Sequence, residues 1–444
     1  MSQAVIAGEP PWYRSLNSSQ WNTLIASNLG WMFDGYETFA LVMAVGAALR
    51  QLLDPSQYSQ IPVYAGATIA LTLLGWGIGG LIGGVITDYL GRKRTMMLAI
   101  VSYSIMTGLS AFAWDWVSFV VLRFLVGLAI GSEWVTGASI VAELWPDRAR
   151  GRGVGLMQSG LGIGFFLGSF AWLFVGPLGP NAWRYMFLLG VLPALLTLWI
   201  RRSIPESDRW ERVNDQRQVA IERKRSGASL GKQDAALTRF TVTDLFVEGE
   251  TRRRVLLALV MSLATTLAFW GIGTWIPPYM ASLSTKAGLN GEQWASYGGM
   301  ALNGTAVIGY VGFGFLADAF GRKQVTFFYV LAAFLSVPLL FYGAQSLTAA
   351  LICAGLCGAF VSGQYTWMAA WLPELFPTRM RATAAGFIFN TPRFIAWTGP
   401  LISGWLTTHA GGLSRAATAI ALIYIPSLIC VLFLPETAGK PLPD

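Results

Sequence analysis

Charge is scarce in this 444-residue sequence, because only 12% of its residues are Asp, Glu, Lys or Arg. A typical soluble domain carries about 25% charged residues. Hydrophobic residues make up 54% of the chain, and the mean hydropathy is +0.52. A soluble globule cannot bury that much apolar surface, so the ordinary soluble classes are excluded.

Histidine and cysteine are almost absent. The single histidine, His409, lies at the outer end of an apolar run or in the loop that follows, so carboxylates must carry any proton that the protein moves. The three cysteines fall inside apolar runs, so neither disulfides nor a metal site is expected. No phosphate-binding loop of the Walker type is present, and no cofactor is expected.

The apolar residues form long runs, and about 20 such residues cross a bilayer as one helix. The first run, from Trp21 to Leu49, is too long for the core of a signal peptide and is expected to remain as a span. We therefore predict an all-α membrane protein. Its twelve predicted transmembrane helices lie near residues 22–48, 63–87, 95–114, 117–142, 153–176, 183–200, 254–280, 294–317, 325–343, 347–372, 382–407 and 414–433.

Lys and Arg are distributed unevenly between the predicted loops, and short cytoplasmic loops of membrane proteins collect these residues. If both termini are cytoplasmic, the opposite side carries only Arg50, Arg184, Lys286 and Arg415. The net charge of +8 is then explained by topology, without a nucleic-acid partner. We expect a monomeric, multi-pass protein of the inner cell membrane with both termini in the cytoplasm.

One long polar segment, residues 202–253, separates the sixth predicted span from the seventh. It carries charges of both signs. We interpret it as a solvated cytoplasmic loop with an amphipathic helix along the membrane face, the alternative being a regulatory site. This loop divides the chain into an N-terminal six-helix half, residues 1–201, and a C-terminal six-helix half, residues 254–444.

Three motifs occur twice, at nearly the same offset. Gly84-x-x-x-Asp88-x-x-Gly91-Arg92-Lys93 recurs 230 residues later as Gly314-x-x-x-Asp318-x-x-Gly321-Arg322-Lys323. Glu143-Leu144-Trp145-Pro146-x-Arg148-x-Arg150 recurs 231 residues later as Glu374-Leu375-Phe376-Pro377-x-Arg379-x-Arg381. Ile204-Pro205-Glu206-Ser207 recurs 230 residues later as Leu434-Pro435-Glu436-Thr437. The chain is therefore predicted to be two copies of one unit, a parallel repeat in which one half rocks against the other around a central site.

These repeated loops resemble the signature of the major facilitator superfamily over the whole chain, and the two Pro-Glu endings are similar to those of its sugar-porter-like branches. A narrower resemblance is to the sialate:proton symporter family, which includes sialic acid and lactate/pyruvate permeases. It is carried by Phe33-Asp34-Gly35-Tyr36-Glu37, Arg123-Phe124-Leu125-Val126-Gly127 and Gly131-Ser132-Glu133-Trp134. The bacterial sialic acid permeases have additional membrane segments between their halves, which residues 202–253 cannot form, so a smaller acid than sialate is favoured.

Ionisable side chains are few inside the predicted spans. Each costs about 2.5–3.5 kcal/mol at the bilayer centre, so such residues usually face a cavity and serve a function. The first half contains Asp34, Glu37, Arg123 and Glu133. Asp34 and Glu37 lie one turn apart on one face of the first helix. We predict an Asp34–Arg123 ion pair, which the family resemblance implies to be the proton-coupling element: protonation from outside would release Arg123.

This pair has a simpler interpretation as a buried salt bridge that only orients two helices. Glu133 is predicted to be a second titrating group or a gate residue, the alternative being a polar residue paired across helices. Its counterpart in the second half is Gln364, a neutral isostere, so proton chemistry is predicted for the first half alone.

Arg393 is the only cation inside the predicted spans of the second half, and no acidic partner is visible there. A guanidinium group binds a carboxylate through two parallel hydrogen bonds. Arg393 and the nearby Asn390 are therefore predicted substrate ligands, and the alternative for Arg393 is a cation that snorkels to the membrane interface. The further candidates for substrate binding are Arg123, Gln364 and Trp134.

The duplicated loops are predicted to form a cytoplasmic gate. Asp88 and Asp318 can accept hydrogen bonds from helix N-termini across the interface between the halves and can pair with arginines. The alternative is that the loops only determine folding and topology. The predicted gate residues are Asp88, Arg92, Glu143, Arg148, Asp318, Arg322, Glu374 and Arg379.

The sequence thus predicts a transporter and not an enzyme: a symporter that imports a small organic anion, most simply a monocarboxylate, together with protons. Its expected partners are that anion, protons and the lipid bilayer. Two alternatives stay open. One is an uncoupled facilitator or exchanger of sugar-like or aromatic acid solutes, and the other is a transport-dead membrane sensor on the same fold. A sensor would be expected to carry an output domain or to lack the intramembrane charges, and neither is seen.

Overall fold

The computed structural model describes residues 11–443 apart from residue 345 and residues 399–412. These residues form helices and loops, without a strand. Nine of the helices in this part of the chain are long and apolar enough to cross a membrane, and a shorter apolar helix covers Ala182–Leu196. The predicted class, an all-α membrane protein, is confirmed.

The helices fall into two groups joined by a short helical segment. The first half contains α1 (Ser18–Leu52), α2 (Ile61–Leu90), α3 (Arg92–Ser110), α4 (Trp116–Ile130), α5 (Glu133–Leu144), α6 (Arg150–Val175), α7 (Ala182–Leu189) and α8 (Pro193–Ser203). The connecting segment contains α9 (Asp208–Arg225), α10 (Lys232–Leu237) and α11 (Thr241–Val247). The second half contains α12 (Gly249–Lys286), α13 (Gly291–Phe320), α14 (Arg322–Pro338), α15 (Leu347–Cys357), α16 (Thr366–Leu375), α17 (Arg381–Asn390), α18 (Arg393–Ala396), α20 (Leu413–Ala421) and α21 (Tyr424–Phe433).

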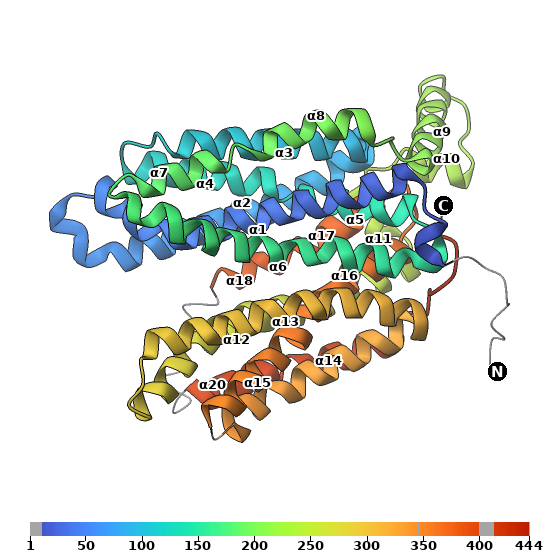
Figure 1. Ribbon diagram of the computed structural model, residues 1–444. Helices are drawn as coiled ribbons and strands as arrows, with labels where there is room; N and C mark the ends of the chain where they lie inside the picture. The colour runs from blue at the N-terminus through green and yellow to red at the C-terminus, as the bar shows by residue number, and fades with distance from the viewer. Residues whose placement is uncertain (1–10, 345, 399–412, 444) are drawn as a thin grey trace.

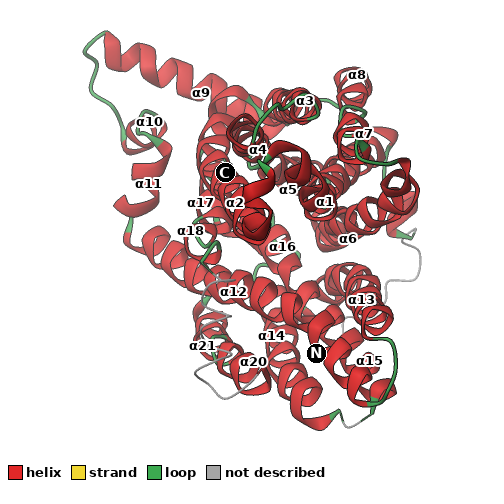
Figure 2. Cartoon of the chain, turned by 90° about the vertical axis from the view of Figure 1, so that its left-hand side faces the viewer, coloured by secondary structure: helices red, strands yellow, loops and turns green. Residues whose placement is uncertain are grey.

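The long helices of both halves run roughly side by side, and α9 and α10 lie at one end of the molecule (Figure 1). We call this end the gate end, because the duplicated motifs lie there. Seen along the helices, α1 to α8 form one group and α12 to α15 another (Figure 2). The halves meet where α6 packs on α13 and where α2 packs on α17. These two contacts are equivalent under the internal repeat.

Several predicted spans are broken helices. The span near 117–142 consists of α4 and α5, and the span near 347–372 consists of α15 and α16 with irregular turns between them. The span near 183–200 is also two helices, α7 and α8, because Pro193 lacks the N–H that would continue the first one. In the span near 382–407, α17 and α18 reach Ala396 and a turn follows at residues 397–398; the remainder lies outside the described residues, as does His409.

Local sequence signals explain where the helices begin and end. The side chain of Asn17 accepts a hydrogen bond from the backbone of Gln20 and caps α1, and Asp115 caps α4 in the same way. Gly91 and Gly321 each have a φ of 101°, a conformation that side chains with a Cβ rarely adopt. They turn α2 into α3 and α13 into α14, so the repeated motif builds the same corner in both halves.

Candidate functional site

A small cleft, with a cavity volume of about 40 Å³, lies between α1, α2 and α4, with Trp270 of α12 on its second-half side. Its lining residues on α1 and α2 belong to the parts of these helices that are remote from the gate end. The lining residues are Glu37, Thr38, Leu41, Val42, Ile69, Thr72, Leu73, Trp76, Arg123, Val126, Ile130 and Trp270. Apart from the two charged groups, the lining is apolar or aromatic with two threonines.

The two charged residues of the cleft form an ion pair. Arg123 Nη1 donates to Glu37 Oε1 at 2.6 Å, and Arg123 Nη2 donates to Thr107 Oγ1 at 3.3 Å. Both charged side chains are buried. The predicted Asp34–Arg123 pair is therefore wrong. Three residues advance a helix by about 4.5 Å, and Arg123 lies at the depth of Glu37, one turn farther from the gate end than Asp34.

Asp34 lies instead beside Glu133, the first residue of α5. Helix α1 packs on α5, and the two carboxyl groups are close enough to interact with each other. Both side chains are fully buried, and no donor among the described residues reaches the oxygens of either one. Gly30 makes room for this arrangement, because a Cβ there would lie 2.0 Å from Glu133 Oε1. The structure thus brings together two predicted residues, as a pair of carboxyls that sequence reasoning did not connect.

Arg393 is buried near the centre, at the start of α18. Its Nη1 donates to the Phe389 carbonyl at 2.6 Å, and its guanidinium carbon lies 4.7 Å from the Trp76 ring centroid and 4.2 Å from that of Phe389. Its Nε has no hydrogen-bond partner, and no carboxylate of the described residues pairs with it. Since Trp76 also lines the cleft, Arg393 lies directly behind one cleft wall.

Asn390 lies on the neighbouring helix α17. It donates to the Gly386 carbonyl at 2.9 Å, while its Oδ1 has no donor in the described structure. The side chain fits against α2 because residue 80 is a glycine, where a Cβ would lie 2.0 Å from Asn390 Nδ2. Asn390 is thus placed near Arg393, as predicted, with one acceptor still available.

The remaining substrate candidates differ in position. The Trp134 ring stacks on the Phe389 ring at 3.6 Å and 10°, which joins the two halves, and its Nε1 donates to Gln158 at 3.0 Å. Gln364 donates to the Tyr424 hydroxyl at 2.8 Å, while its Oε1, like Asn390 Oδ1, has no donor among the described residues. Trp134 therefore belongs to the central cluster around Arg393, and Gln364 lies inside the second half with one acceptor available.

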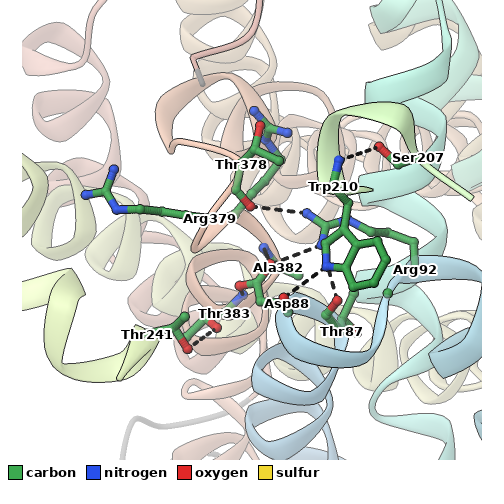
Figure 3. Close-up of polar contacts among 12 residues, drawn as sticks. Thr87, Asp88, Arg92, Ser207, Trp210, Thr241, Thr378, Arg379, Ala382 and Thr383 are labelled. Carbon is green, nitrogen blue, oxygen red and sulfur yellow. Dashed lines mark hydrogen bonds and ion pairs between the residues drawn. The ribbon is translucent and has the colours of Figure 1, made fainter. Parts of the chain in front are cut away.

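The predicted gate aspartates connect the two halves. Asp88, near the end of α2, accepts from the backbone N–H groups of Ala382 at 3.2 Å and Thr383 at 2.8 Å, at the start of α17 (Figure 3). Asp318, near the end of α13, accepts from two successive backbone N–H groups at the start of α6, at 2.9 Å each. Each carboxylate lies where the helix dipole favours negative charge. These are the cross-half contacts that the repeat predicts.

Arginine–carboxylate pairs extend this network within each half. They are Arg92–Asp88 at 3.3 Å, Arg92–Glu143 at 2.9 Å, Arg322–Asp318 at 2.8 Å and Arg322–Glu374 at 2.9 Å. Breaking a buried pair of this kind by removing one partner is strongly destabilising, because the other charge is left uncompensated. These pairs therefore hold the duplicated loops of each half in place at the gate end.

Two of the predicted gate arginines lie at the edge of this network. Arg148 is exposed, and Arg379 pairs with Asp244 of α11 at 2.9 Å. Arg150 and Arg381, the buried first residues of α6 and α17, make the cross-half ion pairs instead. These pairs are Arg150–Glu374 at 2.8 Å and Arg381–Glu143 at 2.7 Å. The repeat contained a signal for these two residues, because Arg150 and Arg381 occupy the last position of the repeated motif.

The connecting segment also bridges the halves at the gate end. Arg217 of α9 is buried and donates to the Asp88 carbonyl at 2.7 Å and to the Arg379 carbonyl at 2.9 Å. Trp210 Nε1 donates to the same Asp88 carbonyl at 3.0 Å (Figure 3). Residues 208–225 are thus part of the closed gate in addition to being a connection.

Sequence reasoning gave no role to the two glutamates of the Pro-Glu endings. Glu206 accepts from the backbone N–H groups of Arg92 and Lys93, and Glu436 accepts from those of Arg322 and Lys323. Each carboxylate therefore caps the N-terminus of α3 or α14. Partial burial raises the pKa of Glu436, but the N–H groups that donate to it outweigh burial, and its pKa is below the ordinary value of 4.5.

We expect the Glu436→Gln variant to be less heat-stable than the wild type at pH 7, and the difference to shrink as the pH is lowered. Because the folded-state pKa is depressed, the stabilisation is present above the ordinary pKa near 4.5 and is lost as the pH falls through the folded value. Thermal unfolding in detergent at several pH values measures this. The exposed Glu222→Gln variant is the control. A difference that does not depend on pH would contradict the role assigned to the carboxylate charge.

Comparisons with known proteins place this architecture in a family. The family model described as "Sugar (and other) transporter" matches residues 23–444. The chain is 29% identical to a gallate transporter of Pseudomonas putida, with 94% of this chain and 92% of the relative covered. It is 27% identical to the sialic acid transporter NanX of Escherichia coli, with 97% and 98% covered.

Among solved structures, the proton:xylose symporter XylE superposes with a TM-score of 0.77 at 22% identity, over 96% of this chain and 98% of that one. This similarity shows the fold alone, which is that of the major facilitator superfamily. The chain therefore belongs to the sugar (and other) transporter family, as a multi-pass membrane transporter and not an enzyme.

Proposed function

We propose that the protein is a symporter that imports a small organic monocarboxylate together with protons, by alternating access. The observation that carries this proposal is the separation of buried charges. The acids lie in the first half, as the Glu37–Arg123 pair and the Asp34–Glu133 pair, and a guanidinium without an acidic partner lies in the second half at Arg393. One half can therefore handle protons while the other binds an anion.

The Asp34–Glu133 pair is the proposed proton carrier. Two ionised carboxylates in contact inside a membrane protein repel each other, and neither has a donor here to compensate. One shared proton removes the repulsion and supplies the missing hydrogen bond. The pair thus has two states, with and without that proton, that differ by one charge at the centre of the protein. The Glu37–Arg123 pair lines the cleft and is the group that solvent protons reach first.

The substrate carboxylate is proposed to bind Arg393 and Asn390. The guanidinium still has an unpaired Nε donor and is held between the Trp76 and Phe389 rings. A carboxylate facing it would remove the cost of a buried, uncompensated cation. The surrounding aromatic faces favour a flat organic acid, which can stack where an aliphatic acid cannot. Relatives named as gallate, benzoate and niacin transporters support this substrate class.

Sialate stays a second candidate. The sequence argued against sialate, because this chain has no extra membrane segments between its halves. However, this chain covers 98% of the length of the relative named as a sialic acid transporter. That relative therefore needs no such segments, and the length argument does not hold. Sialate also carries a carboxylate, which can bind the same Arg393 guanidinium.

The arrangement corresponds to an outward-facing state if the gate end is cytoplasmic, as the concentration of Lys and Arg in its loops favours. Ion pairs and α9 close the gate end, while the cleft lies on the other side. We therefore propose that the protein lies in the inner membrane with both termini in the cytoplasm. Residues 202–253 would then form a cytoplasmic segment between the two halves, residues 1–201 and 254–444.

Uptake into proteoliposomes tests the function. We expect radiolabelled benzoate or gallate to accumulate when the outside is more acidic than the inside, and the accumulation to disappear with a protonophore. Lactate, pyruvate, niacin and sialate, measured as competitors, rank the substrates. Equal uptake of the preferred acid with and without the pH gradient would contradict proton coupling and leave a facilitator.

A further inference from the structure

Tyr103, on α3, is a buried tyrosine to which neither the sequence nor the comparisons assign a role. Its side chain is fully buried, and its hydroxyl has no hydrogen-bond partner among the described residues. The large majority of buried polar side-chain atoms have a partner, so an unpaired one calls for an explanation. The neighbouring Ser104 hydroxyl is also buried and unpaired in this part of the structure.

The surroundings of Tyr103 supply that explanation. Tyr103 lies one turn before Thr107, whose hydroxyl contacts Arg123 of the cleft pair, just as Asp34 lies one turn before Glu37 on α1. Helix α3 packs on α4, which carries Arg123, and on α5, which carries Glu133, so Tyr103 lies at the level of the Asp34–Glu133 pair. The remaining charged residues of the helices packed on α3 lie near the helix ends, at Asp88 of α2, Glu143 of α5, Arg184 of α7, and Arg201 and Arg202 of α8.

At the positions around Tyr103, the internal repeat differs between the two halves. Helices α3 and α14 begin at equivalent residues, Arg92 and Arg322, directly after the repeated glycines. In the same register, Tyr103 corresponds to Ala333, Ser104 to Phe334 and Thr107 to Val337. At these three positions the hydroxyl groups of the first half are replaced by apolar groups in the second, while the buried hydroxyls of α14 lie elsewhere, at Thr326, Tyr329 and Ser336. A purely structural role in the six-helix unit would not require this difference.

We propose that Tyr103 is a positioning residue for proton coupling, whose hydroxyl donates a hydrogen bond to the acidic pairs when they are ionised. This inference rests on the proposed proton-coupled function and adds a residue to it. A phenolic O–H stabilises a carboxylate more than a carboxylic acid, because hydrogen bonds to charged groups are the stronger ones. Tyr103 therefore favours release of the shared proton from the Asp34–Glu133 pair.

The hydroxyl can serve the two pairs in turn. A proton that arrives at Glu37 from the cleft leaves as the Glu37 O–H bond breaks and an Oη–H bond forms on Tyr103. The original Oη–H bond breaks at the same time, and its proton forms an O–H bond on Asp34 or Glu133. The phenol is neutral before and after, so one proton and one negative charge exchange places and nothing else is consumed.

The Tyr103→Phe variant tests this inference, because it removes the O–H and leaves the ring. We expect the midpoint pH of uptake to rise by about 0.5 to 1 pH unit, since loss of a hydrogen bond worth about 0.5–1.5 kcal/mol makes the ionised pair less favourable. Substrate exchange, which moves no net proton, is expected to be unchanged. The matched control is Tyr329→Phe in α14, a buried tyrosine whose hydroxyl donates to the Gly309 carbonyl at 3.2 Å, away from the acids.

A second measurement does not depend on transport. Proton release from the substrate-free protein in detergent, followed as the pH is raised, should have its midpoint shifted upward in Tyr103→Phe and not in Tyr329→Phe. Coincident release curves and uptake profiles for wild type and both variants would overturn the role of Tyr103 and leave the proposed function intact. Wild-type uptake that is the same with and without a pH gradient would instead overturn the proposed function. The proton-release curves would still decide the role of Tyr103.

Discussion

The Asp34→Asn variant is expected to lose substrate accumulation driven by a pH gradient while retaining exchange of labelled for unlabelled substrate. Asparagine fills the same space beside Glu133 but takes up no proton, and its amide donates to that carboxylate permanently. The pair is then fixed in one charge state. For one coupled proton, each pH unit sustains about tenfold accumulation in the wild type, and the variant should reach only the external concentration.

Counterflow and pH-driven uptake in the same proteoliposomes separate the two activities. Glu133→Gln is expected to behave in the same way, because either carboxyl alone has no partner with which to share a proton. Asp54→Asn, in the exposed loop before α2, is the control. If Asp34→Asn still concentrates the substrate against a gradient, Asp34 is not part of the proton carrier.

The Arg393→Ala variant is expected to bind carboxylate substrates about 10- to 100-fold more weakly than the wild type, because hydrogen bonds to charged groups contribute about 1.5–3 kcal/mol. Folding should tolerate the change, since Arg393 has no acidic partner among the described residues to be left uncompensated. Arg393→Lys keeps the charge but not the planar fork, so we expect it to restore only part of the affinity.

Ligand-induced thermal shifts with benzoate, gallate and lactate measure these affinities in detergent, and the corresponding amides measure the contribution of the carboxylate. The exposed Arg50→Ala is the control for general loss of positive charge. Unchanged affinity for the acids in Arg393→Ala would show that the carboxylate binds elsewhere, with Arg123 as the next residue to examine.

The sequence predicted those parts of the molecule that depend on local pattern and on the repeat. Apolar runs gave the helices, and the spacing from Gly84 to Lys93, repeated from Gly314, gave two equivalent corners whose aspartates bind the opposite half. These features were predictable because an apolar helix in lipid and a glycine at positive φ have few alternatives.

Partners across helices were predicted less well. The sequence placed Asp34, Glu37, Arg123 and Glu133 in the membrane, yet it paired Arg123 with the wrong carboxylate. It likewise chose Arg148 for the gate where the buried residue is Arg150. In each case the right and wrong residues are two or three positions apart, a few ångströms along a helix or turn, which is less than the uncertainty of a predicted boundary.

By itself, the sequence determined that this protein is a duplicated helical membrane protein with acids confined to one half and an arginine to the other, because composition and order along the chain suffice for that. Only the tertiary structure decided which charges meet: Arg123 with Glu37, Asp34 with Glu133, and Arg393 with aromatic rings and no acid. Those contacts depend on the depth and rotation of each helix, which packing against neighbouring helices sets and no local pattern encodes.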